Sequence, residues 1–270
     1  MSMEVKFTKM HGLGNDFIFV DKKDLPAAFD IKPAVISLSR RHTGIGCDQF
    51  IIYDDQDSFI DISIYNSDGS SAQACGNATR CLSYLFSKIK NTEHIKISVQ
   101  GRVLECAAEN ADNVSVNMGE VKFDCAWMPS YESLAKELSP YLSSSAQFLC
   151  ADIGNPHLVI IDPNLSQDDM SLLGPRLEKS ALFPNGVNVN FANILDDVIE
   201  LKVWERGAGF TYACGSGACA SFAACHKLGF VPDNAKVKFE LGTLDMKLES
   251  GEVIMNGKVA LVAMGIFYYG

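Results

Sequence analysis

The chain has 270 residues, 47% of them hydrophobic and 21% charged, which is the balance of an ordinary globular protein and not of a disordered or fibrous one. Its formal net charge of -10 disfavours a nucleic-acid partner, and the sequence contains no apolar run of the roughly 20 residues that a membrane span needs. The start MSMEVKF lacks the apolar segment of a signal peptide. We therefore expect a cytoplasmic protein with neither a nucleic-acid nor a membrane partner.

The nine cysteines predict free thiols. They are odd in number and scattered over the chain, which argues against a disulfide framework. Zinc is not expected either, because the sequence has no Cys-x-x-Cys pair. Cys75 and Cys81 are six residues apart on a predicted helix and would point to different faces. We predict no metal site.

The chain repeats itself, since four segments resemble four later segments in the same order at an offset of about 140 residues. The pairs are LGNDFIFVD (13–21) with IGNPHLVIID (153–162), YNSDGSSAQACGNATRC (65–81) with WERGAGFTYACGSGACA (204–220), SVQGRVLEC (98–106) with FELGTLDMK (239–247), and VNMG (116–119) with VAMG (262–265). The chain is therefore predicted to be two related halves that meet just after Gly119. The predicted domains are 1–118 together with 263–270, and 119–262.

In the first half, Ile60, Ile62 and Ile64 alternate with polar residues, which predicts a half-buried strand. After Cys75, apolar side chains recur at the spacing of one buried helical face. They are Ala78, Cys81, Leu82, Leu85, Phe86 and Ile89. The segment 131–147 lies between the repeated blocks and predicts a helix inserted in the second half.

The second half repeats this order. Ile199, Leu201 and Val203 alternate with polar residues and predict a strand. The helix after Cys214 is predicted to bury Ala218, Phe222, Cys225 and Leu228 and to stop at Gly229. Further on, the pair Asn256-Gly257 favours a tight hairpin. Each half is thus strand-rich around one helix, which predicts the α+β class.

In each half, a Cys-Gly pair stands where a strand gives way to a helix, so Cys75 and Cys214 are predicted to lie beside the N–H groups of a helix N-terminus. A thiol with a pKa of about 8.5 is only a few per cent ionised at pH 7. A partly buried helix end lowers that pKa by roughly one unit, which gives about a quarter thiolate. The simpler interpretation of either cysteine alone is a small buried residue.

Two cysteines at matching positions favour a different interpretation. If the halves pack about a pseudo-twofold axis, the two thiols can face one carbon, where a thiolate removes a proton and a thiol donates one on the opposite face. Two like charges in one pocket oppose each other, so only one thiol should ionise. The helix N-termini would stabilise the enolate-like charge, and no cofactor is required.

The order of several motifs is also that of a known family. They are MHGLGNDFIFVD, RRHTGIGCDQ, YNSDGSSAQACGNATRC, GNPHLV, PNGVNVNF and ERGAGFTYACGSGACAS. Over nearly its whole length the chain resembles diaminopimelate epimerase. The resemblance implies cofactor-independent epimerisation of LL-2,6-diaminopimelate to meso-diaminopimelate, in lysine and peptidoglycan-precursor biosynthesis. It also implies two homologous barrel-like domains, each around a central helix, related by pseudo-twofold symmetry, and it allows a homodimer formed through the first domain.

The resemblance assigns a role to each matching residue. It makes Cys75 and Cys214 the catalytic base and acid. The backbone amides that receive the reacting carboxylate are those of Gly76, Asn77, Gly215 and Ser216. Asn15 and Gln49 line the reactive end of the substrate, and the distal end is held by Asn66, Asn155, Asn188, Glu205 and Arg206. His157 is expected near Glu205 as a supporting polar partner.

Several of these residues have a plainer interpretation when taken alone. Asn15 and Asn155 follow glycines and could cap turns. Arg206 could be a solvated charge at a strand end, although its guanidinium is well suited to hold a carboxylate with two hydrogen bonds. His157 could be structural, and Asn188 could belong to a hairpin.

One departure from the family pattern concerns Phe210, which stands where members usually have Glu. It predicts altered loop packing or an altered pKa of Cys214. Two rival functions remain open. One is a two-cysteine racemase of the same superfamily acting on proline, hydroxyproline or histidine. The residues assigned to the distal end of the substrate argue against it, namely Glu205, Arg206, Asn66, Asn155 and Asn188. The other is a non-catalytic thiol or metal-binding protein, which stoichiometric zinc would identify.

Overall fold

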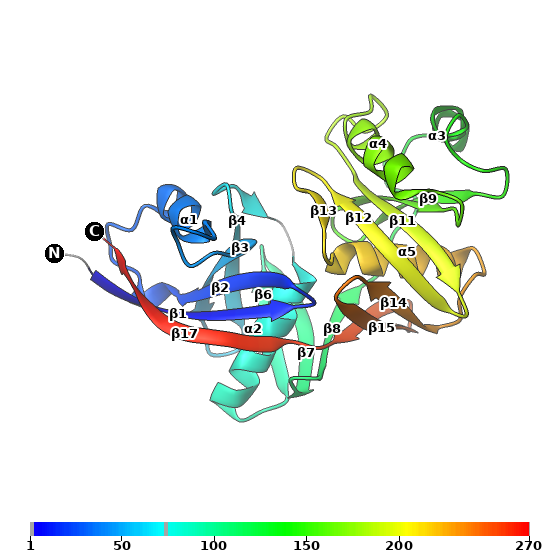
Figure 1. Cartoon of the computed structure of the whole chain (residues 1–270). Coiled ribbons are helices and arrows are strands. Elements are labelled where there is room, and N and C mark those ends of the chain that lie inside the picture. Colours follow the sequence, from blue (N-terminus) through cyan, green and yellow to red (C-terminus); the bar gives the residue numbers. More distant parts are fainter. Residues whose placement is uncertain (1–2, 73–74, 270) are drawn as a thin grey trace. The chain divides into compact units, whose positions relative to one another are not determined.

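The chain forms two compact units in the computed structural model, which describes residues 3–72 and 75–269 (Figure 1). The units comprise Met1–Asn117 with Asn256–Gly270, and Met118–Met255. The C-terminal stretch of the first unit begins at Asn256, earlier than position 263, where the sequence predicts the boundary. The reason is that the last strand pairs with the first strand from Ala260 onward, which places 260–262 in the first unit.

The first unit is a mixed sheet around a helix. Its strands are β1 (Met3–Gly12), β2 (Asn15–Asp21), β3 (Gln49–Asp55), β4 (Ile60–Asn66), β5 (Ser71–Ala72), β6 (His94–Val99), β7 (Arg102–Asn110), β8 (Asn113–Gly119) and β17 (Ala260–Tyr269). They pair in the order β17-β1-β2-β3-β4-β6-β7-β8, with β5 also on β4. The pairs β2–β3 and β4–β6 are parallel, and parallel neighbours need a crossover. The crossovers carry α1 (Ile31–Ser39), which the one-turn 3-10 helix Lys22–Asp24 precedes, and α2 (Gly76–Lys90).

The second unit repeats this arrangement. Its elements are α3 (Tyr131–Leu138), β9 (Gln147–Asp152), β10 (Pro156–Ile161), α4 (Gln167–Glu178), β11 (Asn188–Leu195), β12 (Val198–Glu205), β13 (Gly209–Thr211), α5 (Gly215–Lys227), β14 (Asn234–Phe239), β15 (Gly242–Glu249) and β16 (Glu252–Gly257). The strands pair in the order β9-β10-β11-β12-β14-β15, and β10–β11 and β12–β14 are the parallel pairs. The identical alternation of parallel and antiparallel pairs confirms two homologous α+β halves.

The crossover helices α2 and α5 are each enclosed by the sheet of their own unit. The helix α2 packs against β1, β2, β6 and β7, and α5 packs against β9, β10, β11, β12, β14 and β15. A helix surrounded in this way must be apolar or small on all sides, and α5 accordingly consists largely of glycine, alanine and cysteine. The prediction that this helix buries Ile89 is wrong, because Ile89 lies in the last turn of α2 and is 61% exposed.

Two local expectations need correction. The inserted helix is shorter than 131–147, because α3 begins after the N-cap Ser130 and ends at Leu138. Asn256-Gly257 ends β16 and forms no tight hairpin, whereas the two-residue link with positive φ lies at Ser250 (52°) and Gly251 (86°). Among the described residues, no helix is long and apolar enough to cross a bilayer.

Candidate active-site halves

Cys75 is the N-cap of α2, in extended backbone geometry with φ of -151°. Its sulfur accepts a hydrogen bond from the backbone N–H of Ala78 at 3.5 Å. Gly76 and Asn77 are the first two residues of this helix, and their N–H groups belong to its N-terminal turn. The predicted placement of a thiol at a helix N-terminus is thus what the structure shows in this unit. Gln73 and Ala74, which precede Cys75 in the motif, lie outside the described residues.

Asn15 approaches the same sulfur from the start of β2. Its Oδ1 atom lies 3.8 Å from Cys75 Sγ and accepts a hydrogen bond from Asn77 Nδ2 at 3.2 Å. Its Nδ2 atom donates to Asp48 Oδ2 at 2.9 Å. Asn15 is therefore not merely a turn cap, because its amide connects Cys75 and Asn77 to an acidic side chain.

The other polar residues predicted in this unit form a second pair. Gln49 and Asn66 are opposite each other in the β3–β4 ladder, and Gln49 Nε2 donates to Asn66 Oδ1 at 3.0 Å. Asn66 Nδ2 in turn donates to Ser70 Oγ at 3.1 Å. The side chains of this pair are partly buried, which leaves them accessible to a ligand.

Behind Asn15 lies an ionic cluster that the sequence analysis did not single out. Arg41 makes two hydrogen bonds to the Asp16 carboxylate, at 2.9 and 3.0 Å, and one to Asp48 at 2.6 Å, while Lys9 Nζ lies 3.1 Å from Asp16. Burial alone would raise the pKa of Asp16, but the hydrogen bonds and charges of Arg41 and Lys9 outweigh it and lower that pKa. The Asp16 carboxylate therefore stays charged, and Arg41, which bonds to both carboxylates, holds Asp48 against Asn15.

A second residue missed from the sequence is Arg80, which is completely buried within α2. Its Nη2 atom donates to Asn77 Oδ1 at 3.0 Å, so the guanidinium fixes the side chain next to Cys75. A Cβ atom at Gly12 of β1 would lie 3.1 Å from that Nη2 atom, so a side chain at this position would crowd the guanidinium. The sequence around Arg80 predicts only a helix with a buried apolar face. It therefore does not indicate that Arg80 fixes the side chain of Asn77.

Cys214 is the N-cap of α5 and is 5% exposed. The N–H of Gly217 donates to its sulfur at 3.4 Å, and Ser216 Oγ lies 3.5 Å away. Gly215 and Ser216 begin the helix as Gly76 and Asn77 begin α2. The two cysteines thus occupy the same position on equivalent helices, each with a hydrogen bond from the third helical residue.

The predicted lowering of the thiol pKa is wrong for Cys214. Burial, followed by the negative charge of Glu205, raises its pKa well above the ordinary value. A hydrogen bond with Glu205 acts in the same direction, whereas the hydrogen bonds with Ser216 and Gly217 lower the pKa by a smaller amount. Without substrate, Cys214 is therefore a protonated thiol.

Removing the charge of Glu205 should lower the pKa of Cys214. Glu205→Gln retains an oxygen that can accept the S–H hydrogen, so the variant isolates the effect of the charge. We expect faster alkylation of Cys214 by iodoacetamide at pH 7 to 8, by a factor of about ten for each unit of pKa. Peptide mass spectrometry would follow this site among the nine cysteines.

Thr211→Val is the matched control for this prediction, because Thr211 Oγ1 donates to Glu205 Oε1 at 2.5 Å. The substitution leaves the carboxylate charge in place and removes one of its donors. Alkylation of Cys214 should not become faster. An unchanged rate in Glu205→Gln would show that Glu205 does not control this thiol.

Arg206 follows Glu205 in the turn after β12, and it is held from several directions. Its backbone N–H donates to Asn188 Oδ1 at 3.0 Å, and its Nη1 atom donates to the carbonyl of Asn185 at 2.8 Å. Asn188 Nδ2 donates to the carbonyl of Pro156 at 2.9 Å, so Asn188 links two strands and does not belong to a hairpin turn.

Glu178, at the end of α4, also holds this turn and was missed from the sequence. Its carboxylate accepts hydrogen bonds from Trp204 Nε1 at 2.7 Å and from the N–H of Gly207 at 2.9 Å. A single glutamate on an amphipathic helix carries no motif. Its role depends on the packing of α4 beside the turn that carries Arg206.

His157 is fully buried in β10, and its ring nitrogens bond to Asn155 Oδ1 at 3.0 Å and to Asn190 Nδ2 at 3.1 Å. Burial lowers its pKa to about 4, so the imidazole is neutral at pH 7. Asn155 Nδ2 donates to Ser216 Oγ at 3.3 Å and so connects His157 to the turn that begins α5. These contacts pair His157 with two amides, and its predicted place near Glu205 stays a prediction.

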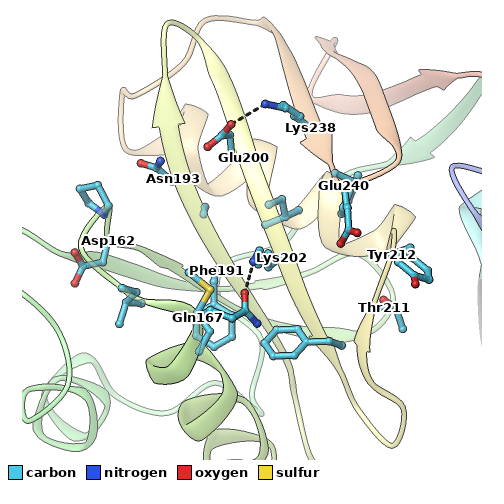
Figure 2. A pocket seen from close by; sticks show the side chains of 17 residues that line it. Asp162, Gln167, Phe191, Asn193, Glu200, Lys202, Thr211, Tyr212, Lys238 and Glu240 are labelled. Carbon is cyan, nitrogen blue, oxygen red and sulfur yellow. Dashed lines mark hydrogen bonds and ion pairs between the residues drawn. The ribbon is translucent and has the colours of Figure 1, made fainter.

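Phe210 packs on aromatic neighbours. Its ring meets Trp204 edge to face at 5.2 Å and lies 6.4 Å from Phe191. It lines a cavity of about 650 Å³ on the face of β11 and β12 that carries Glu200 and Lys202 (Figure 2). None of the residues predicted for the site lines this cavity. Phe210 thus takes part in the packing of this turn, and an effect on the pKa of Cys214 stays a prediction.

The fold of the chain is shared by solved proteins that are described as epimerases. It is similar to a predicted epimerase from Pseudomonas aeruginosa, with a TM-score of 0.73, 15% identity, and coverage of 97% of this chain and 99% of the other. It is also similar to a hydroxyproline epimerase from Agrobacterium vitis with bound trans-4-hydroxy-L-proline, with a TM-score of 0.68, 12% identity, and coverage of 98% and 92%. At these identities the likeness concerns the fold alone.

Sequence comparison defines the family. The family model of diaminopimelate epimerase matches residues 7–123 and 149–262. The chain is 49% identical over 269 residues to diaminopimelate epimerase of Rickettsia akari, covering 100% of this chain and 99% of the relative. It is 48% identical over 268 residues to that of Rickettsia felis, covering 99% of each. The chain belongs to the diaminopimelate epimerase family and is an amino-acid epimerase.

Proposed function

We propose that the chain epimerises LL-2,6-diaminopimelate to meso-diaminopimelate without a cofactor, with Cys75 and Cys214 as the two proton carriers. The observation that supports this best is their equivalence. Each is the N-cap of the enclosed helix of its unit, and each sulfur accepts a hydrogen bond from the third helical N–H, at 3.5 and 3.4 Å. The raised pKa of Cys214 makes it the proton donor in the free enzyme.

The proton balance of this reaction closes without a further reagent. A thiolate takes the α-proton and becomes a thiol, and the electron pair of the broken C–H bond moves onto the adjacent carboxylate as an enolate. The second thiol returns a proton to the opposite face of the carbon and becomes a thiolate. Backbone N–H groups of Gly76, Asn77, Gly215 and Ser216 would stabilise the enolate charge. After one turnover the charges of the two sulfurs are exchanged.

The distal end of the substrate is proposed to contact the second polar set. Its members are Asn66, Asn155, Asn188, Glu205 and Arg206, while Asn15 and Gln49 line the reactive end. An exposed guanidinium suits a carboxylate, and the carboxylate of Glu205 suits an ammonium group. Such a pair favours a substrate with two amino-acid ends. We also propose that the reaction belongs to lysine and peptidoglycan-precursor biosynthesis in the cytoplasm.

Incubation with LL-diaminopimelate in deuterium oxide tests the proposed function. The expected result is formation of the meso isomer, with one solvent deuteron incorporated at the inverted carbon. Proline, hydroxyproline and histidine serve as parallel substrates and should show neither inversion nor exchange. Turnover of one of these, with none of diaminopimelate, would contradict the proposed substrate.

A homodimer through the first unit is a further part of the proposal. Val262, Met264, Ile266 and Tyr268 alternate along β17 and are 48–68% exposed, which makes an apolar stripe of the kind that marks interfaces. Glu4 and Lys6 of β1 pair in register with Tyr268 and Ile266. A twofold axis would set the stripe against its copy and bring Lys6 of one copy near Glu4 of the other.

Ile266→Lys should therefore convert the dimer into a monomer, because it places a charge in the middle of the stripe. Analytical ultracentrifugation at micromolar concentration would measure the change. Leu195→Lys is the control, since Leu195 is 54% exposed at the end of β11 in the second unit. A wild-type monomer, or a dimer that persists in Ile266→Lys, would contradict this interface.

A further inference from the structure

Asn190 is a buried amide on β11, two residues after Asn188, and the proposed mechanism gives it no role. Its Nδ2 atom lies 3.1 Å from the carbonyl oxygen of Leu158 and 3.4 Å from that of Asn188. Carbonyl oxygens can only accept hydrogen bonds, so the atom facing them is the NH₂ group of the amide. The orientation of the Asn190 side chain is thereby fixed by the backbone of two neighbouring strands.

The third neighbour of this NH₂ group is His157 Nδ1, at 3.1 Å. Because Asn190 presents a donor, Nδ1 must be the acceptor, and the single proton of the neutral imidazole is on Nε2. The Nε2–H group then donates to Asn155 Oδ1 at 3.0 Å. A protonated Nδ1 would instead set two donors against each other in a fully buried place.

The hydrogen bonds continue from Asn155 through Ser216 to the sulfur of Cys214. With its Oδ1 atom bonded to His157, Asn155 turns its NH₂ group to Ser216 Oγ at 3.3 Å. Since Ser216 Oγ accepts this bond, its own hydrogen is available for Cys214 Sγ at 3.5 Å. Asn190, His157, Asn155, Ser216 and Cys214 thus form a chain in which each member donates to the next.

We propose that Asn190 is a positioning residue, which fixes the tautomer of His157 and thereby directs a chain of hydrogen-bond donors onto the sulfur of Cys214. The chain stabilises the thiolate and so opposes Glu205, which stabilises the thiol. It also keeps the NH₂ group of Asn155 facing Ser216, as a donor suited to an oxygen of the substrate. Only this last point rests on the proposed function.

The oxygen atom of the Asn190 amide has lost its hydrogen bonds to the described part of the chain in this arrangement. Asn190 Oδ1 is buried and has no hydrogen-bond partner among the residues that the structure describes. It faces Gly217, where a Cβ atom would lie 2.7 Å from it. An unsatisfied buried acceptor is unfavourable, and it is retained here because three acceptors on the opposite side share the two hydrogens of the NH₂ group.

The first test uses the wild-type protein and needs no substrate. Nitrogen-15 NMR of labelled histidine should show His157 as a neutral imidazole with its proton on Nε2, unchanged between pH 8 and pH 5.5. A ring with its proton on Nδ1, or one that becomes a cation in this range, would overturn the proposal. Because this readout is independent of activity, it stands or falls separately from the proposed epimerisation.

The second test reverses the chain with Asn190→Asp. A carboxylate at this position can only accept hydrogen bonds, so it gives up those to the carbonyls of Leu158 and Asn188 and draws the proton of His157 to Nδ1. His157 Nε2 then accepts from Asn155, whose Oδ1 atom turns to Ser216 and takes the hydroxyl hydrogen away from Cys214. We expect the Nδ1–H tautomer in the NMR spectrum and slower alkylation of Cys214.

The added negative charge of Asn190→Asp also acts on Cys214 directly, and a double-mutant cycle separates the two effects. Ser216→Ala removes the last donor of the chain. If the chain carries the effect, Asn190→Asp should slow alkylation much less in the Ser216→Ala protein than in the wild type. Equal slowing in both backgrounds would show an effect of charge alone and would overturn the proposal. If Asn190→Asp does not fold, the wild-type spectrum still decides.

Discussion

Alanine in place of either Cys75 or Cys214 should abolish epimerisation of diaminopimelate, because one of the two proton transfers then has no carrier. A positioned acid or base contributes roughly 10²- to 10⁴-fold to a rate, and loss of a nearly irreplaceable carrier should lie at or beyond the upper end of that range. The measurement is formation of the second stereoisomer. Both cysteines are N-caps with few side-chain atoms, so neither substitution should unfold its unit.

Each alanine variant nevertheless keeps one base. It should still exchange the α-proton of the isomer presented to the remaining thiol, slowly and with retention of configuration. The two variants should prefer opposite isomers. Deuterium uptake measured for both isomers with both variants therefore distinguishes two bases from one. A one-base mechanism predicts one dead variant and one nearly normal variant.

Two other cysteines serve as matched controls. Cys81 lies in α2 and Cys219 in α5, and both are completely buried within the helices that Cys75 and Cys214 cap. Alanine at either position removes a thiol from the same helix but leaves the N-cap intact. Epimerisation per folded molecule should remain close to that of the wild type. A comparable loss of activity in these controls would mean that the effect comes from packing and not from proton transfer.

The second large effect is expected from Arg206→Met. The substrate's distal carboxylate would lose a charge-assisted contact worth about 1.5 to 3 kcal/mol, so kcat/KM should fall by roughly 10- to 150-fold. The methionine stem can still lie over Gly186, as the arginine stem does: a Cβ atom at Gly186 would lie 2.8 Å from Arg206 Cδ. The backbone hydrogen bond to Asn188 does not depend on the side chain. The fold should therefore be retained, as circular dichroism and thermal unfolding would show.

A substrate analogue without the distal carboxylate sharpens this prediction. It should be a poor substrate for the wild-type enzyme, and Arg206→Met should reduce its turnover no further. Arg176→Met is the control, because Arg176 is a half-exposed arginine on α4 that pairs with Glu137. Catalytic efficiency near that of the wild type in Arg206→Met would remove this residue from the site.

The repeated segments made the fold predictable to a considerable degree. Strand alternation around Ile62 and Leu201, and the Cys-Gly pairs, marked equivalent strand–helix junctions, and these are local features that do not depend on distant packing. The hairpin predicted at Asn256-Gly257 failed because β17 pairs with the distant β1, which draws the chain onward in extended form.

Candidate site residues could be predicted only where a motif marks them. Arg80 and Glu178 act through contacts that folding creates, with Asn77 in one case and with Trp204 and Gly207 in the other. Neither has a spacing that indicates its role. The pKa of Cys214 was misjudged for a similar reason. The helix N-terminus is local, but burial and the charge of Glu205 arise from the tertiary structure and outweigh it.

The pairing of β1 with β17 also sets the order in which a growing chain can complete its two units. The second unit, Met118–Met255, is continuous in sequence, so all of its strands are available before the last residues are made. The first unit begins earlier but needs β17 (Ala260–Tyr269) beside β1. Its oldest strand must therefore wait for the youngest, with one backbone edge of β1 unpaired meanwhile. During synthesis, the half that is made first is the half that closes last.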